Sequence, residues 1–263
     1  MTLVAICSFA LIGIISGILS GLLGIGGGVI IIPGLMLVFQ HLDLSSDLMH
    51  LAIGTSLASM IFNTLSASYS HYKKNAVLFP VVKPMGLGIC VGALCGAYLA
   101  RLLPSYFLQV FFGVFECILG IYLFFPSRKV FKHRTLPKFW GLSTIAVGVS
   151  TFSTILGVGG GLINVPLLCY FNTPLKKAIG TSSALSFLIS VLGAASFFIF
   201  GMHASDSPDS IGFLYLPGFI VISIAALFAA PYGVKLAHYF PTNLLKKIFG
   251  IALIITGVIM ILS

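Results

Sequence analysis

Apolar runs separated by short polar loops cover most of the chain. Six of the eight runs have about the length of one membrane-spanning helix, ~20 residues. The first and the fifth are longer, and a glycine cluster interrupts each of them. The runs are residues 3–39, 48–70, 77–100, 105–125, 139–171, 178–201, 211–234 and 244–262. This pattern predicts an all-α integral membrane protein in which two segments are broken or re-entrant at their glycines.

The two interrupted runs carry the same motif, which indicates an internal repeat. LGIGGGVIIIP at 23–33 recurs 133 positions later as LGVGGGLINVP at 156–166. Two further matches follow in the same order: AIGTS at 52–56 and 178–182, and GAYLARLLP at 96–104 with GVKLAHYFP at 233–241. We therefore expect two membrane repeats of about four apolar segments each, residues 1–126 and 139–263, joined by a basic cytoplasmic linker, residues 127–138.

Composition excludes a soluble protein. Apolar residues make up 59% of the chain and charged residues 7%, with a mean hydropathy of +1.15, whereas soluble domains are about half apolar and a quarter charged. The net charge of +9 comes from basic residues in short loops, which report orientation and not nucleic-acid binding. The five cysteines lie in apolar runs without ligand-like spacing. We expect them to be small buried residues, with no disulfide frame, metal site or cofactor.

The distribution of Lys and Arg favours inverted repeats, because short cytoplasmic loops are enriched in these residues. If all eight runs cross the membrane, the basic residues divide as eight against six. If the first and fifth runs instead enter and leave on the same side, 13 of the 14 share one side and only Arg101 is opposite. We therefore predict two inverted repeats with six full spans, and eight full spans remain the alternative.

The glycine motif indicates an anion site near the middle of the membrane. Glycine permits backbone shapes that other residues disfavour and leaves its N–H uncovered. A helix that resumes at Val29 or at Leu162 would direct its positive N-terminus at the turn. Broken helices at the interface of inverted repeats are common in transporters, although glycine also serves close helix packing. The candidate substrate-binding glycines are Gly24, Gly26, Gly27, Gly28, Gly157, Gly159, Gly160 and Gly161.

Polar side chains near the motif are further candidates. The hydroxyl groups of the AIGTS region either bind substrate or satisfy backbone carbonyls, and Asn164 and Asn63 either bind substrate or link helices by hydrogen bonds. Glu116, the one acid in an apolar run, either carries a coupling proton or stays protonated or snorkels to the interface. The hydroxyl candidates are Thr55, Ser56, Thr181, Ser182 and Ser183, and the structural members of the motifs are Gly54, Gly180, Pro33 and Pro166.

With LGxGGGxxxxP present twice and AIGTS after each copy, the chain resembles the TauE/SafE family of sulfite and organosulfonate exporters, also called the toluene sulfonate uptake permease family. The resemblance covers essentially the whole chain. It implies a multi-pass permease of a prokaryotic inner membrane that moves sulfur-containing anions such as sulfite, sulfoacetate or related sulfonates. Matched by position, the family motif falls on the eight glycines named above and on Pro33 and Pro166.

The function expected from these features is a secondary carrier that moves a small sulfur-containing anion by alternating access. A passive anion channel and a carrier for a different small anion are the alternatives. An intramembrane enzyme is disfavoured, because the sequence has no HExxH or GxSxG motif of the kind that hydrolases use. The expected partners are the anion and the lipid bilayer; the substrate, the direction of transport, the coupling ion and a homodimeric state stay open.

Overall fold

The computed structural model describes residues 3–42, 47–124, 135–202, 209–239 and 242–262. Most of the predicted linker, residues 127–134, lies outside these residues. The described part folds into α-helices and one two-stranded hairpin. The elements are α1 (Leu3–Leu23), α2 (Gly28–Gln40), α3 (Leu48–Tyr72), α4 (Phe79–Leu102), α5 (Ser105–Phe124), α6 (Phe139–Ile155), α7 (Gly161–Tyr170), α8 (Leu175–Gly201), β1 (Ser210–Ile211), β2 (Leu214–Tyr215), α9 (Leu216–Tyr239) and α10 (Thr242–Leu262).

The predicted class, an all-α multi-pass membrane protein, is confirmed. Six helices of the described part are long and apolar enough to cross a membrane: α1, α3, α4, α5, α8 and α9. This set includes α1, whose 21 residues reach about 30 Å, while α10 contributes the shorter apolar stretch Phe249–Leu262. The sequence does not predict the β1–β2 hairpin, which forms where Asp209 and Gly212 adopt positive φ angles.

Both interrupted runs break at their glycines, as predicted. The breaks separate α1 from α2 and α6 from α7. Phe9 near the start of α1 and Phe39 near the end of α2 both contact the ring of Tyr215, with centroids 6.1 and 5.2 Å away. In the second repeat, Leu142 near the start of α6 and Leu168 near the end of α7 share one apolar cluster. The chain thus enters and leaves each helical pair at the same end.

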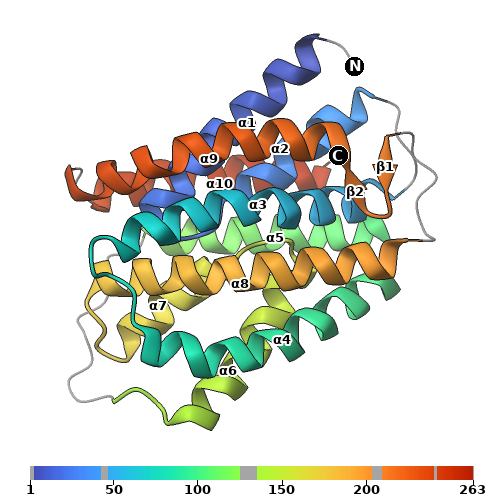
Figure 1. Cartoon of the computed structure of the whole chain (residues 1–263). Helices are drawn as coiled ribbons and strands as arrows, with labels where there is room; N and C mark the ends of the chain where they lie inside the picture. The colour runs from blue at the N-terminus through green and yellow to red at the C-terminus, as the bar shows by residue number, and fades with distance from the viewer. Residues whose placement is uncertain (1–2, 43–46, 125–134, 203–208, 240–241, 263) are drawn as a thin grey trace.

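Two rows of glycines let helices of different repeats pack closely. Spacing by four residues keeps each row on one helix face, and the missing side chains let two backbones approach. The rows are Gly13, Gly17 and Gly21 of α1, which face α9, and Gly88, Gly92 and Gly96 of α4, which face α6. Each outer helix pair in Figure 1 therefore combines one helix from each repeat.

Helices α3 and α8, which are equivalent under the repeat, lie antiparallel at the centre of the molecule (Figure 1). The start of α3 and the end of α8 meet at Phe213, which contacts Gly54 and Gly201. The start of α8 meets the end of α3, where Gly180 contacts Ala76. An inverted repeat requires such contacts, whereas the sidedness of the two halves in a membrane stays a prediction.

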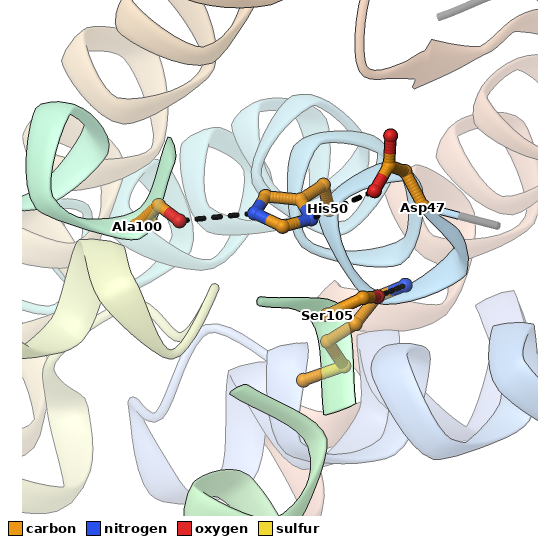
Figure 2. A network of polar contacts seen from close by, with 5 residues as sticks. Asp47, His50, Ala100 and Ser105 are labelled. Atoms are coloured by element: carbon orange, nitrogen blue, oxygen red, sulfur yellow. Dashed lines mark hydrogen bonds and ion pairs between the residues drawn. The ribbon is translucent and has the colours of Figure 1, made fainter. Parts of the chain in front are cut away.

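Polar contacts fix the start of α3 against the corner between α4 and α5 (Figure 2). The backbone N–H of Met49 donates to the Ser105 hydroxyl at 2.9 Å. The buried ring of His50 places Nε2 2.9 Å from the Ala100 carbonyl and Nδ1 3.9 Å from the Asp47 carboxylate. These contacts orient α3, whose next turns carry the first AIGTS motif.

Basic residues from three segments gather at one end of the molecule. The pKa of Lys74, which follows α3, lies below its ordinary value because of partial burial and then because of the positive charges of Lys235 on α9 and Lys176 on α8. Eight full spans would put Lys74 on the side opposite Lys176. Their proximity therefore favours the arrangement with two re-entrant segments.

The expectation that the cysteines are buried is wrong for Cys7, Cys90 and Cys95, which are exposed on the protein surface. In a membrane protein the outer surface is itself apolar. An apolar run therefore does not distinguish a core position from a lipid-facing one.

Cysteine labelling tests the sidedness. In a background in which the five native cysteines are replaced, we expect Lys74→Cys and Lys176→Cys to react with a membrane-impermeant maleimide from the cytoplasmic side. Asp209→Cys, at the opposite end, serves as the control and should react from outside. Labelling of Lys74→Cys and Lys176→Cys from opposite sides would contradict the inverted arrangement.

Candidate functional site

The two glycine turns, residues 24–28 and 157–161, meet backbone to backbone beside α3 and α8. A Cβ atom on Gly28 would overlap the carbonyl oxygen of Gly157, and one on Gly161 would overlap the carbonyl oxygen of Gly24. A Cβ on Gly26 would lie 3.1 Å from the Cα of Gly159. Glycine is therefore required by the approach of the two turns.

Each turn ends in a left-handed residue that starts the next helix. Gly27 (φ 87°) precedes α2, and Gly160 (φ 70°) precedes α7. The helices resume at Gly28 and Gly161, one residue before the predicted positions. Because intrahelical bonding begins only with later N–H groups, those of Gly27 and Gly28, and of Gly160 and Gly161, have no backbone acceptor within the described residues. Such helix starts favour an anion.

The Gly157 and Gly24 carbonyls of the turns accept hydrogen bonds from serines of the opposite repeat. The Ser56 hydroxyl on α3 donates to the Gly157 carbonyl at 3.0 Å. The Ser182 hydroxyl on α8 donates to the Gly24 carbonyl at 3.1 Å, and the Ser186 hydroxyl reaches the same oxygen at 3.4 Å. These bonds cross between the repeats and hold the turns in register.

The threonine and the glycine of each AIGTS motif contact a neighbouring loop. The Thr55 hydroxyl accepts the N–H of Tyr215, which directly precedes α9, at 2.9 Å. The Thr181 hydroxyl accepts the N–H of Leu78, which directly precedes α4, at 3.0 Å. Gly54 and Gly180 let the same two loops approach. Ser183 bonds its own helix, at the Ile179 carbonyl. Contact of these residues with substrate stays a proposal.

The remaining candidates divide into satisfied and unsatisfied groups. Asn63 donates to the Gly26 carbonyl at 3.0 Å, whereas neither amide atom of buried Asn164 has a partner within the described residues. Sequence reasoning missed Ser153, a buried hydroxyl that also lacks a described partner. Its only signal is its position 133 residues after Ser20 in the repeat.

Glu116 lies on α5 between Gly113 and Gly120, two glycines that face α10. Its carboxyl group is fully buried, and neither oxygen has a well-formed hydrogen bond to a described residue. The prolines of the glycine motifs do not break their helices, because α2 continues through Pro33 and α7 through Pro166.

The family model described as Sulfite exporter TauE/SafE matches residues 9–260. The chain belongs to the TauE/SafE family. Similar proteins include a probable membrane transporter protein of Haemophilus influenzae, 29% identical over all of this chain and 99% of its own length. Probable membrane transporter protein YunE of Bacillus subtilis is 29% identical over 94% of this chain and 93% of its own. No solved structure gives a significant match.

The TauE/SafE family consists of membrane transporters and not of enzymes. The relatives are named as membrane transporters without a stated substrate. With the six candidate spans, the family assignment makes the chain a multi-pass membrane transporter of prokaryotic type.

The threonine contacts give a prediction for stability. Thr55→Val and Thr181→Val each leave a backbone N–H without its acceptor, so each should lower the free energy of unfolding by about 1–3 kcal/mol. The two losses should add, since the sites lie at opposite ends of the α3–α8 pair. Thermal unfolding of the purified protein in detergent measures the effect.

Two controls accompany this test. Thr→Ser at either site keeps the hydroxyl acceptor and should restore most of the stability. Thr144→Val removes a hydroxyl that bonds the Trp140 carbonyl of its own helix on the exposed face, and it should change little. Wild-type stability of both Thr→Val variants would show that these contacts do not hold the loops.

Proposed function

We propose that this protein carries a small sulfur-containing anion, such as sulfite or a sulfonate, across the membrane by alternating access, with its site where the two glycine turns meet. The observation that carries the proposal is the pairing of two helix starts, α2 and α7. Beside them the Gly24 and Gly157 carbonyls are already bonded, whereas the N–H groups at the two helix starts have no backbone acceptor among the described residues. This leaves donors available and acceptors occupied, which favours an anion.

The choice of a sulfur anion comes from the family, whose description names sulfite export. The site chemistry supports it, because a sulfur oxyanion offers several acceptor oxygens to convergent N–H and hydroxyl donors. Among the buried residues of the described part there is no Lys or Arg. The anion would therefore be held by neutral donors alone.

In this proposal Glu116 is the group that takes up a coupling proton. A buried carboxyl group in a membrane helix is costly and is a functional candidate for that reason. The close glycine contacts of α5 with α10 shield it from lipid, and the Thr256 hydroxyl of α10 lies near it.

Flux measurements in proteoliposomes test the transport proposal. We expect the wild type to move sulfite or a sulfonate with saturable kinetics, and Gly160→Ala to abolish the flux, because its Cβ would press on Ser153, Asn164 and Ile189 at a left-handed residue. Gly148→Ala on α6 is the matched control, since its Cβ meets no atom within 4 Å. Non-saturating currents would instead identify a channel, and normal flux in Gly160→Ala would contradict the site.

A second measurement addresses coupling. Glu116→Gln removes the titratable group but keeps the shape, so we expect flux that no longer responds to an imposed pH gradient while exchange without a gradient persists. Glu116→Asp retains a carboxyl group and should retain the response. A full response in Glu116→Gln would exclude Glu116 as the coupling residue.

A further inference from the structure

Two polar side chains lie beside the second glycine turn, next to Ile189, whose Cδ1 would be 2.7 Å from a Cβ atom on Gly160. A Cβ atom on Gly160 would lie 3.0 Å from the Ser153 hydroxyl oxygen and 3.2 Å from the Asn164 amide nitrogen. Both side chains are fully buried, with 0% exposure. The Ser153 hydroxyl and both amide atoms of Asn164 have no hydrogen-bond partner among the described residues. Both side chains therefore converge on the start of α7 with their hydrogen bonds unmade.

These unpaired groups lower the stability of the protein unless a ligand supplies their hydrogen bonds. A buried hydroxyl or amide without a partner costs about 1–3 kcal/mol, and native proteins keep few such groups. Here three unpaired atoms share one place with the N–H groups of Gly160 and Gly161, which also lack described acceptors. Their concentration at one turn points to ligand binding and not to helix packing.

In the first repeat the equivalent amide is already hydrogen-bonded to the protein. A Cβ atom on Gly27 would lie 3.0 Å from the Asn63 amide nitrogen. That amide donates to the Gly26 carbonyl at 3.0 Å, and its oxygen lies 3.5 Å from the Ser20 hydroxyl. Asn63 thus has contacts at both ends of its amide.

The repeat offsets show how this asymmetry arises. Ser20 and Ser153 are equivalent at an offset of 133, so both turns have a serine. The equivalent of Asn63 at an offset of 126 is Ile189, which offers no hydrogen bond, and the equivalent of Asn164 is Ile31. In the second repeat the amide therefore lies on α7, where it makes no hydrogen bond equivalent to the one between Asn63 and the Gly26 carbonyl.

We infer that the protein binds one anion per chain, in the second repeat only, through the Ser153 hydroxyl, the Asn164 amide and the N–H groups at the start of α7. This inference rests on the proposed transport of a sulfur oxyanion. The ligand carries a single negative charge, because the donors are neutral and a second buried charge would have no compensation. In the first repeat, Asn63 already bonds the Gly26 carbonyl and lies near the Ser20 hydroxyl.

Equilibrium binding to the full chain in nanodiscs tests this, with sulfite, methanesulfonate and sulfate as probes. We expect one ion per chain and tighter binding of methanesulfonate than of sulfate. Asn164→Leu and Ser153→Ala should each weaken binding by about 3- to 10-fold, the loss expected for one neutral hydrogen bond. Ser190→Ala, which removes a buried hydroxyl bonded within its own helix, is the matched control and should bind normally.

Thermal stability without added anion gives a second readout. Ser153→Ala and Asn164→Leu remove unpaired polar groups, so they should unfold at the wild-type temperature or above it. Asn63→Leu removes a formed hydrogen bond, so it should unfold at a lower temperature yet still bind one anion. A purely structural role of Asn164 would give the reverse order.

The outcomes separate this inference from the function on which it rests. Two anions per chain, or wild-type affinity in Asn164→Leu and Ser153→Ala with loss in Asn63→Leu, would overturn the one-sided site and leave the transport proposal standing. Tighter binding of sulfate than of methanesulfonate would overturn the single-charge assignment. A wild type that binds none of the three anions would contradict the proposed function itself.

Discussion

Each glycine turn interrupts a helix inside an apolar layer and so exposes backbone N–H and C=O groups where no water can pair with them, at a cost of several kcal/mol for each unpaired group. Two of these carbonyls are bonded by serines that the repeats exchange. Ser182 of the second repeat bonds the Gly24 carbonyl of the first, and Ser56 of the first bonds the Gly157 carbonyl of the second. Neither repeat completes its own turn.

This exchange determines much of the remaining architecture. For both serines to reach the opposite turn, α3 and α8 must lie side by side and antiparallel, as they do in Figure 1. The turns then come so close that Gly28 and Gly161 exclude any side chain. Outside this centre, the glycine rows bind α1 to α9 and α4 to α6. The boundaries of the sequence repeats therefore do not coincide with separately packed units.

Much of this centre could be predicted from the sequence, because the decisive residues recur. The duplicated glycines predict the two breaks, and the helices resume one residue before Val29 and Leu162. The role of Thr55 could not be predicted, since its partner is the N–H of Tyr215, 160 residues away in a hairpin that hydropathy does not reveal. The exposure of Cys7 could not be predicted either, because core positions and lipid-facing positions are both apolar.

The two kinds of backbone group at the turns differ in a way that bears on transport. The carbonyls of Gly24 and Gly157 accept bonds from serines. The N–H groups at the starts of α2 and α7 have no backbone acceptor in the described part of the chain, so the turns favour negative charge without a basic side chain. A buried lysine would bind an anion more strongly, but it would cost several kcal/mol in the empty state. In the proposed site, neutral donors avoid that cost and leave no ion pair to break at release, so weak binding is what we expect of it. A carrier needs this property, because it must release its ion in every cycle.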